Sequence, residues 1–201
     1  MTAVHALEVD PDVVLRRATA RDSDGLRALI QTSFSVLAPA EYGPQQVRSA
    51  LNHGMTLDPD LVRDGTMTAA LAGDRVVGCA AWAPEGPLTG HHTPISSPAS
   101  LPTSPPGSPS ALAGEAGVAV IRSVFVHPDF IGRGLGRRLI ERVEAEAQTA
   151  GFASFQLLST LTAVQVYLKC GYRAVAEIPV IFADGVEAPF VIMRKDADAH
   201  S

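Results

Sequence analysis

The sequence is short of cysteine, of excess positive charge and of long apolar runs. Only two of its 201 residues are cysteines, Cys79 and Cys170, and neither has CxxC or CxxH spacing, so both are expected to be buried thiols in a reducing compartment. Acidic residues outnumber basic ones by 21 to 16, which argues against a nucleic-acid partner. The longest uncharged stretch, Gly86 to Gly114, is rich in proline and serine, so no membrane span is expected.

The sequence does contain an alternation of strand and helix patterns. The clearest strand is Val118–Val126, rich in β-branched and aromatic residues, and the clearest helix covers 134–150, with Leu135, Leu139 and Ile140 on one face. Further helices are expected at 20–34, 44–53 and 162–172, strands at 13–19 and 152–159, a turn-rich connector at 58–65, and hairpins at 67–84 and 173–195. This order predicts an α/β fold with a mixed sheet of about seven strands and about four helices, in which 134–150 joins two parallel strands.

The chain is expected to form one domain over 13–195, preceded by a flexible leader (1–12) and followed by a tail (196–201). Residues 85–117 are expected to be a disordered insertion, because the segment is crowded with proline, serine and glycine and has almost no charge in its first part. The first residues lack the basic and apolar regions of a secretory signal, so a cytoplasmic location is expected.

Three glycines at alternate positions, Gly132, Gly134 and Gly136, separate the strongest strand from the strongest helix. Glycines permit a tight turn whose N–H groups converge, the helix start adds unpaired N–H groups, and nearby arginines (Arg133, Arg137 and Arg138) supply positive charge. This combination favours an anion, most often a phosphate. The segment matches neither GxxxxGK[ST] nor GxGxxG, so a Walker A loop and a dinucleotide fingerprint are both excluded.

The stretch VHPDFIGRGLG (126–136) resembles the acetyl-coenzyme A motif of the GCN5-related N-acetyltransferase (GNAT) superfamily. A second segment, TAVQVYLKCGY (162–172), resembles the helix that carries a tyrosine in the same family, and the expected element order is similar to the GNAT fold over about 13–195. The resemblance implies an α/β GNAT fold and acetyl-CoA as co-substrate.

The resemblance also implies roles for particular residues. The turn amides would hold the CoA pyrophosphate, the edge of the preceding strand would bind the pantetheine arm like an added strand, and Thr160 stands where many members carry an asparagine. The cofactor-binding residues implied are Val124, Phe125, Val126, Gly132, Arg133, Gly134, Leu135, Gly136, Arg137 and Thr160. Ile131 departs from the family's usual arginine or glutamine, and modest weakening or compensation by Arg133 is expected.

Tyr167 occupies the family's tyrosine position, which implies a general acid that protonates the leaving thiolate. The alternative is a core tyrosine on an amphipathic helix. The N–H of Val126 is the expected donor to the thioester carbonyl. The general base stays open between Glu41, His127 and water, and Arg122 is either a buried ion-pair partner or an anchor for an acidic acceptor. No HxH or HExxH pattern occurs, so no metal is expected.

The function implied is acetyl transfer from acetyl-CoA to a primary amine of a small molecule or peptide, directly in a ternary complex. Two alternatives stay open: an acetyl-CoA-sensing module without turnover, and an acyltransferase that uses another acyl chain or an O-acceptor. The partner expected is the amine acceptor, and neither nucleic acid nor a membrane is expected. Many GNAT members form dimers, so a homodimer stays open, and no feature of the sequence decides it.

Overall fold

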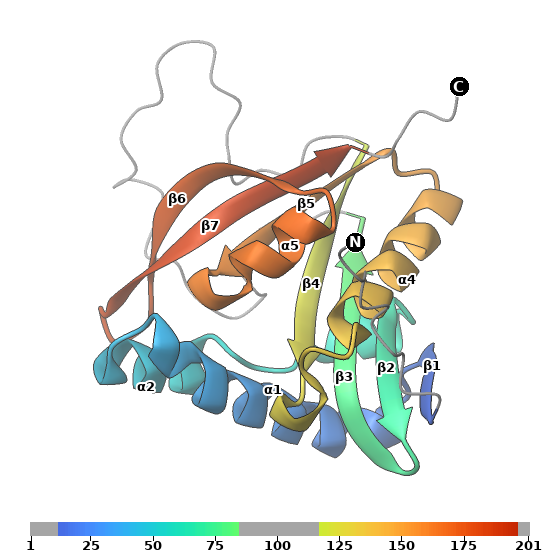
Figure 1. The fold of residues 1–201 in the computed structure, drawn as a ribbon, viewed down its shortest axis with the longest axis horizontal. Coiled ribbons are helices and arrows are strands. Elements are labelled where there is room, and N and C mark those ends of the chain that lie inside the picture. The colour runs from blue at the N-terminus through green and yellow to red at the C-terminus, as the bar shows by residue number, and fades with distance from the viewer. Residues whose placement is uncertain (1–11, 85–116, 197–201) are drawn as a thin grey trace, which may run out of the picture.

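The computed structural model describes residues 12–84 and 117–196, which form one mixed sheet with helices on both faces (Figure 1). The sheet has seven strands in the order β1-β2-β3-β4-β5-β7-β6. Neighbouring strands are antiparallel except β4 and β5, which are parallel. The strands are β1 (Val13–Arg17), β2 (Met67–Ala72), β3 (Arg75–Ala83), β4 (Val118–Val126), β5 (Ser154–Thr160), β6 (Arg173–Ile181) and β7 (Glu187–Asp196).

The described residues contain five α-helices and several short 3₁₀ turns. The α-helices are α1 (Ser23–Leu37), α2 (Pro44–His53), α3 (Pro59–Arg63), α4 (Leu135–Thr149) and α5 (Val164–Lys169). The 3₁₀ turns that matter below are η2 (Ala38–Ala40), η4 (Pro128–Phe130) and η5 (Leu161–Ala163).

Helices α1 and α4 cover opposite faces of the sheet. In β3, Ala80 belongs to the buried cluster that contains α4, whereas Cys79 and Ala81 belong to the cluster that contains α1. This alternation is what a strand covered on both faces requires, because successive side chains point to opposite sides. Both faces of the central strands are therefore buried.

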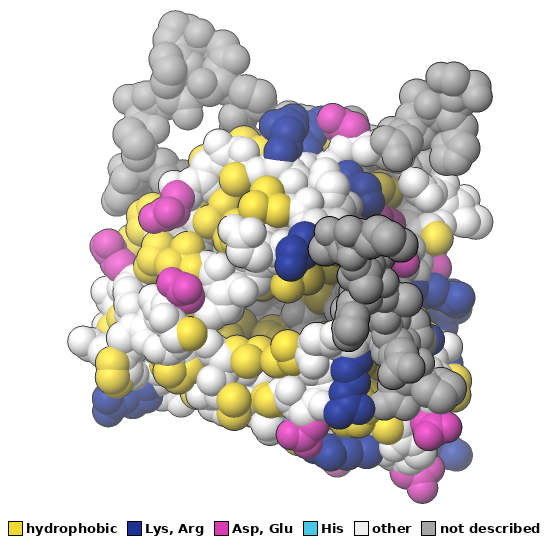
Figure 2. All heavy atoms as spheres, viewed as in Figure 1, with side chains coloured by type: hydrophobic (Ala, Val, Ile, Leu, Met, Phe, Trp, Pro, Cys, Tyr) yellow, Lys and Arg dark blue, Asp and Glu magenta, His cyan; other side chains and the backbone are white. Residues whose placement is uncertain are grey.

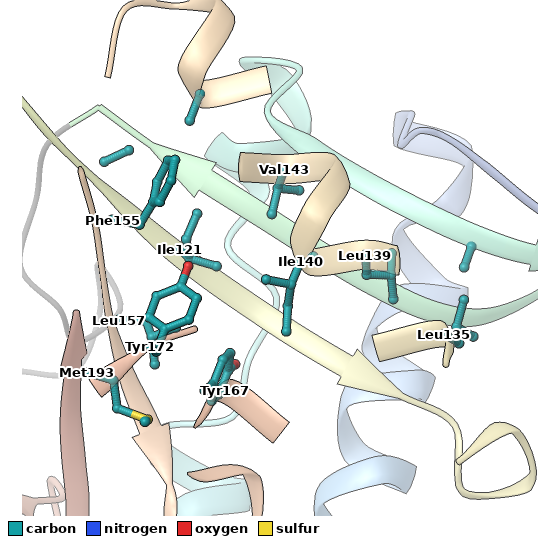
Figure 3. Close-up of a cluster of buried hydrophobic side chains, with 14 of the residues drawn as sticks. Ile121, Leu135, Leu139, Ile140, Val143, Phe155, Leu157, Tyr167, Tyr172 and Met193 are labelled. Atoms are coloured by element: carbon teal, nitrogen blue, oxygen red, sulfur yellow. The ribbon is translucent and has the colours of Figure 1, made fainter. Parts of the chain in front are cut away.

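The larger core lies between α4, α5 and the sheet (Figure 3). Its labelled side chains are Ile121, Leu135, Leu139, Ile140, Val143, Phe155, Leu157, Tyr167, Tyr172 and Met193. Burying one such side chain fully contributes about 1.5–3 kcal/mol. The apolar face of α4 thus holds this helix firmly against β3 and β4, with its first turn at the end of β4.

The α/β fold, the seven strands and the crossover of 134–150 between parallel strands are confirmed. The connector at 58–65 was predicted wrongly, because it contains helix α3, whose start is capped by the Asp58 carboxylate accepting from the Asp60 N–H at 3.0 Å. The first strand ends at Arg17 rather than residue 19, since the Thr19 N–H donates to the Asp22 carboxylate at 2.7 Å.

The expected leader and insertion fall almost wholly outside the described residues. The expected tail starts one residue too early, because Asp196 still pairs with Ser154 as the last residue of β7. The rest of the tail also lies outside the described residues.

Candidate functional site

Strands β4 and β5 diverge after a short parallel contact. Only Val118–Val120 pair with Ser154–Gln156, although β4 continues to Val126. Beyond this point β5 pairs only with β7, so the second half of β4 has an open edge toward α5. An open strand edge offers N–H and C=O groups to a peptide-like ligand.

The N–H of Val126 faces this open edge. The next residue, His127, donates its N–H to the Val77 carbonyl of β3 at 2.9 Å, and backbone groups alternate along a strand. Because Gly78 is the register partner of Val126, that pair is of the type without hydrogen bonds between the strands. The donor that the sequence nominated for a thioester carbonyl thus points where a ligand at the edge would lie.

A β-bulge separates the two halves of β4. The register with β3 shifts between Cys79 and Ala81, and Ser123 has φ 51°, the one positive φ among non-glycine residues in the described part of the chain. The Cys79 thiol donates to the Ser123 carbonyl at 3.1 Å. Bulges bend a strand and re-aim its groups, and this one sits where β4 leaves β5.

The glycine turn lies between η4 and α4, shortly after the end of β4. Gly132 and Gly134 have φ values of 80° and 74°, and Gly134 is the N-cap of α4. Within the described residues, no backbone carbonyl accepts from the amides of Gly132, Gly134, Leu135 or Gly136. A helix start in this geometry presents several N–H groups and its positive dipole end to an anion. The turn therefore fits a phosphate.

The arginines around the turn are held in different ways. Arg133 lies over the Phe130 ring, with 5.2 Å from Cζ to the ring centroid. Arg137 forms an ion pair with Glu141 at 2.6 Å, and Arg138 donates to the Val13 carbonyl at 3.4 Å. Arg138 is thus directed toward β1 and Arg137 toward Glu141, so both side chains are engaged by groups of the chain itself.

Tyr167 lies on α5, in the larger core beside β4. The residue is 7% exposed, and its ring meets Tyr172 edge to face at 5.6 Å between centroids. Figure 3 shows its ring between α5 and β4. No hydrogen bond of its hydroxyl is found among the described residues, and burial raises its pKa above the ordinary 10.0. The phenol is therefore a neutral donor at physiological pH.

Ile131 and Thr160, the two residues that depart from the usual GNAT pattern, lie beside these elements. Ile131 is 48% exposed at the start of the glycine turn, where it contributes an apolar surface instead of a charge. Thr160 ends β5, and its Oγ1 lies 3.0 Å from the Thr162 Oγ1.

The groups considered for acceptor or base chemistry lie in separate surroundings: Arg122 is within β4, His127 follows β4, and Glu41 follows η2. Arg122 is 8% exposed and its guanidinium lies 3.7 Å from the Asp58 carboxylate, so the ion-pair interpretation is supported. Burial lowers the Arg122 pKa and Asp58 opposes the shift. His127 Nε2 lies 2.6 Å from the Arg75 guanidinium, whereas Glu41 is exposed.

Figure 2 shows a hollow near the centre of this view, rimmed by hydrophobic side chains and lying between α5 and α1. No group of three or more His, Cys, Asp or Glu side chains in the described residues is placed to hold a metal ion. Among the same residues, no helix has the length and apolarity that crossing a membrane requires.

The acetyltransferase (GNAT) family model matches residues 26–172. The chain belongs to the GNAT family. A comparison with curated proteins gives no match. Membership of the GNAT family assigns acetyl transfer in general to the chain, and the family uses acetyl-CoA as its acetyl donor.

Solved structures agree with the GNAT fold. A GCN5-related N-acetyltransferase from Rhodopseudomonas palustris has a TM-score of 0.63 at 18% identity, covering 91% of this chain and 94% of that one. A PaiA N-acetyltransferase from Thermoplasma acidophilum in complex with coenzyme A has a TM-score of 0.60 at 13% identity, with 92% and 98% covered. Ard1 from Thermoplasma volcanium has 0.58 at 16% identity, with 92% and 98% covered.

Sequence reasoning missed one residue that joins several parts of the site. Tyr42 follows η2 and is 5% exposed, and its hydroxyl contacts both Leu161 and Pro189. Its partners are 119 and 147 residues away along the chain, so no local pattern indicates them. The only available signal is that the chain has just three tyrosines.

Proposed function

We propose that this GNAT protein transfers an acetyl group from acetyl-CoA to a primary amine of a small molecule or peptide, directly in a ternary complex. The observation that carries the proposal is the combination of three features: the open edge of β4, the glycine turn at the start of α4, and the buried Tyr167 in the same core cluster as Val126 and Leu135. Each feature suits one part of acetyl-CoA, namely the pantetheine arm, the pyrophosphate and the thioester.

The fit to the cofactor rests on backbone geometry. Gly132 and Gly134 adopt the left-handed conformation that orients the turn amides, and charge-assisted hydrogen bonds to such amides contribute roughly 1.5–3 kcal/mol each. The residues that would hold acetyl-CoA are Val124 to Val126 of the open edge and Gly132 to Arg137 of the turn, with Thr160 on the β5 side. Acetyl-CoA supplies the thioester carbonyl and a thiolate leaving group.

The chain would contribute two hydrogen-bond donors to the chemistry. The Val126 N–H would donate to the carbonyl oxygen as negative charge develops there, and the Tyr167 hydroxyl would donate to the sulfur. Because burial raises the Tyr167 pKa, complete proton transfer to a thiolate of ordinary pKa ~8.5 is uphill. Tyr167 would therefore act first as a hydrogen-bond donor that stabilises the departing thiolate while the C–S bond breaks and the C–N bond forms. As the phenol proton passes to the sulfur, the proton released by the acetylated amine would replace it, so that no phenolate is left in the core.

A screen of amines with acetyl-CoA, read by release of free thiol, tests the proposal. Thiol release that depends on the amine, and that falls in Tyr167→Phe without loss of CoA binding by calorimetry, supports it. Tight CoA binding with no thiol release from any amine would favour a sensing module. Turnover with longer acyl-CoA thioesters or with alcohols, but not with acetyl-CoA and amines, would favour a different acyltransferase.

A further inference from the structure

The hydroxyl of Tyr42 lies between strands β5 and β7 at the point where their pairing stops. The last pair of the antiparallel ladder is Thr160 with Phe190, so the next pair in register would be Leu161 with Pro189. Tyr42 takes both groups of that pair: its hydroxyl accepts from the Leu161 N–H at 2.9 Å and donates to the Pro189 carbonyl at 2.8 Å. The phenol thus replaces one rung of the ladder.

This replacement decides where the chain goes after β5. Had Leu161 continued the ladder, β5 would run on beside β7. With the phenol between the two strands, Leu161 instead becomes the first residue of η5, which leads directly into α5 and Tyr167. The Leu161 N–H, which leaves the ladder at this point, finds its partner in the Tyr42 hydroxyl.

The Tyr42 ring is itself held by packing. Its centroid lies 6.2 Å from that of Phe34 in α1 and 5.9 Å from that of Phe190 in β7. Burial raises the pKa of its hydroxyl to about 12, so the group stays protonated and can donate throughout the neutral range. One side chain just before α2 therefore connects α1, η5 and β7.

We infer that Tyr42 is a positioning residue that fixes the start of η5 and thereby sets the place of Tyr167 against the open edge of β4. The inference rests on the proposed role of Tyr167. Tyr42 does not contact the reacting atoms; it acts through the Leu161 amide. Misplacement of a reacting group by about 1 Å can reduce a rate on the order of 100-fold, so loss of this anchor should appear in kcat.

Tyr42→Phe tests the inference, because it keeps the ring and removes only the hydroxyl. Ser49→Ala is the matched control: the Ser49 hydroxyl also ties α2 to the β6–β7 hairpin, through Asp184 at 2.6 Å, but does not touch η5. We expect Tyr42→Phe to lower kcat for thiol release by about tenfold or more while the Kd for CoA changes less than about twofold. Ser49→Ala should lose thermal stability and keep kcat within about twofold of the wild type.

Two further measurements separate positioning from general destabilisation. In a Tyr167→Phe background, Tyr42→Phe should cost little more, because its effect passes through the missing phenol. Hydrogen exchange at the Leu161 amide should be faster in Tyr42→Phe than in Ser49→Ala. This measurement detects loss of the hydrogen bond to Tyr42 directly and does not depend on an activity assay.

An unchanged kcat in Tyr42→Phe, an equal loss in Ser49→Ala, or full additivity with Tyr167→Phe would overturn the inference. Wild-type protein that binds CoA but acetylates no amine would overturn the proposed function instead. The two failures are therefore distinguishable.

Discussion

Replacing Gly134 by alanine should separate the backbone conformation of the turn from the rest of the fold. Gly134 has φ 74° as the N-cap of α4, a left-handed conformation that costs an L-residue with a Cβ roughly 1–2 kcal/mol. For a chain of this size, each 1 kcal/mol lowers the Tm by roughly 2–4 °C. Gly134→Ala should therefore lower the Tm by about 2–8 °C.

The same substitution should also weaken cofactor binding. Alanine favours a negative φ, and relaxation in that direction turns the neighbouring amides away from a shared anion. Loss of one charge-assisted hydrogen bond worth about 1.5–3 kcal/mol corresponds to a roughly 10- to 150-fold higher Kd for acetyl-CoA. Isothermal titration calorimetry measures this Kd directly, and thermal unfolding gives the Tm.

Gly151→Ala is the matched control at the other end of α4. Gly151 has φ 98°, and a Cβ added there would meet no atom within 4 Å, so the substitution introduces comparable strain at a place remote from the turn. We expect Gly151→Ala to lose stability but to bind acetyl-CoA as tightly as the wild type. If Gly134→Ala also keeps wild-type affinity despite its lower Tm, the turn amides are not the pyrophosphate site.

Three other changes should have measurable outcomes. The profile of kcat against pH should show no descending limb from Tyr167 between pH 7 and about 10, because its pKa is raised. Such a limb, if it vanished in Tyr167→Phe, would show that the phenol titrates in this range and would refute the raised pKa. Tyr42 should make the free energy of unfolding in urea depend on pH. Its stabilising contribution should be complete below its ordinary pKa of 10.0 and should be lost as the pH rises toward about 12, so the decrease should be less steep in Tyr42→Phe. Lys195→Met should destabilise by about 3–5 kcal/mol in the same assay, since it leaves the buried Glu144 carboxylate without the ammonium at 2.7 Å, and Glu144→Gln should restore most of the loss.

The sequence was sufficient where the signal is local. Three features depend only on residues close together in the sequence: the strand at Val118–Val126, the three alternating glycines and the apolar face of α4. The structure has all three at the predicted positions. The exposed pair of Arg137 with Glu141 follows from helical spacing for the same reason.

The remaining features depend on contacts between distant segments. The bulge at Ser123 places a non-glycine residue at positive φ. This conformation accompanies the register shift with β3, and a serine in the sequence does not indicate it. Helix α3 has only five residues, too few for a hydrophobic period to emerge. Tyr42 and the Asp58–Arg122 pair join residues from separate elements, so their roles become visible only when the sheet is assembled.

A crystal structure with bound coenzyme A is the most direct test of the site. We predict pyrophosphate oxygens within hydrogen-bonding distance of the amide nitrogens between Gly132 and Arg137, pantetheine along the open edge of β4, and the sulfur next to the Tyr167 hydroxyl. Coenzyme A bound elsewhere, or a sulfur remote from Tyr167 while the pyrophosphate occupies the turn, would contradict this assignment.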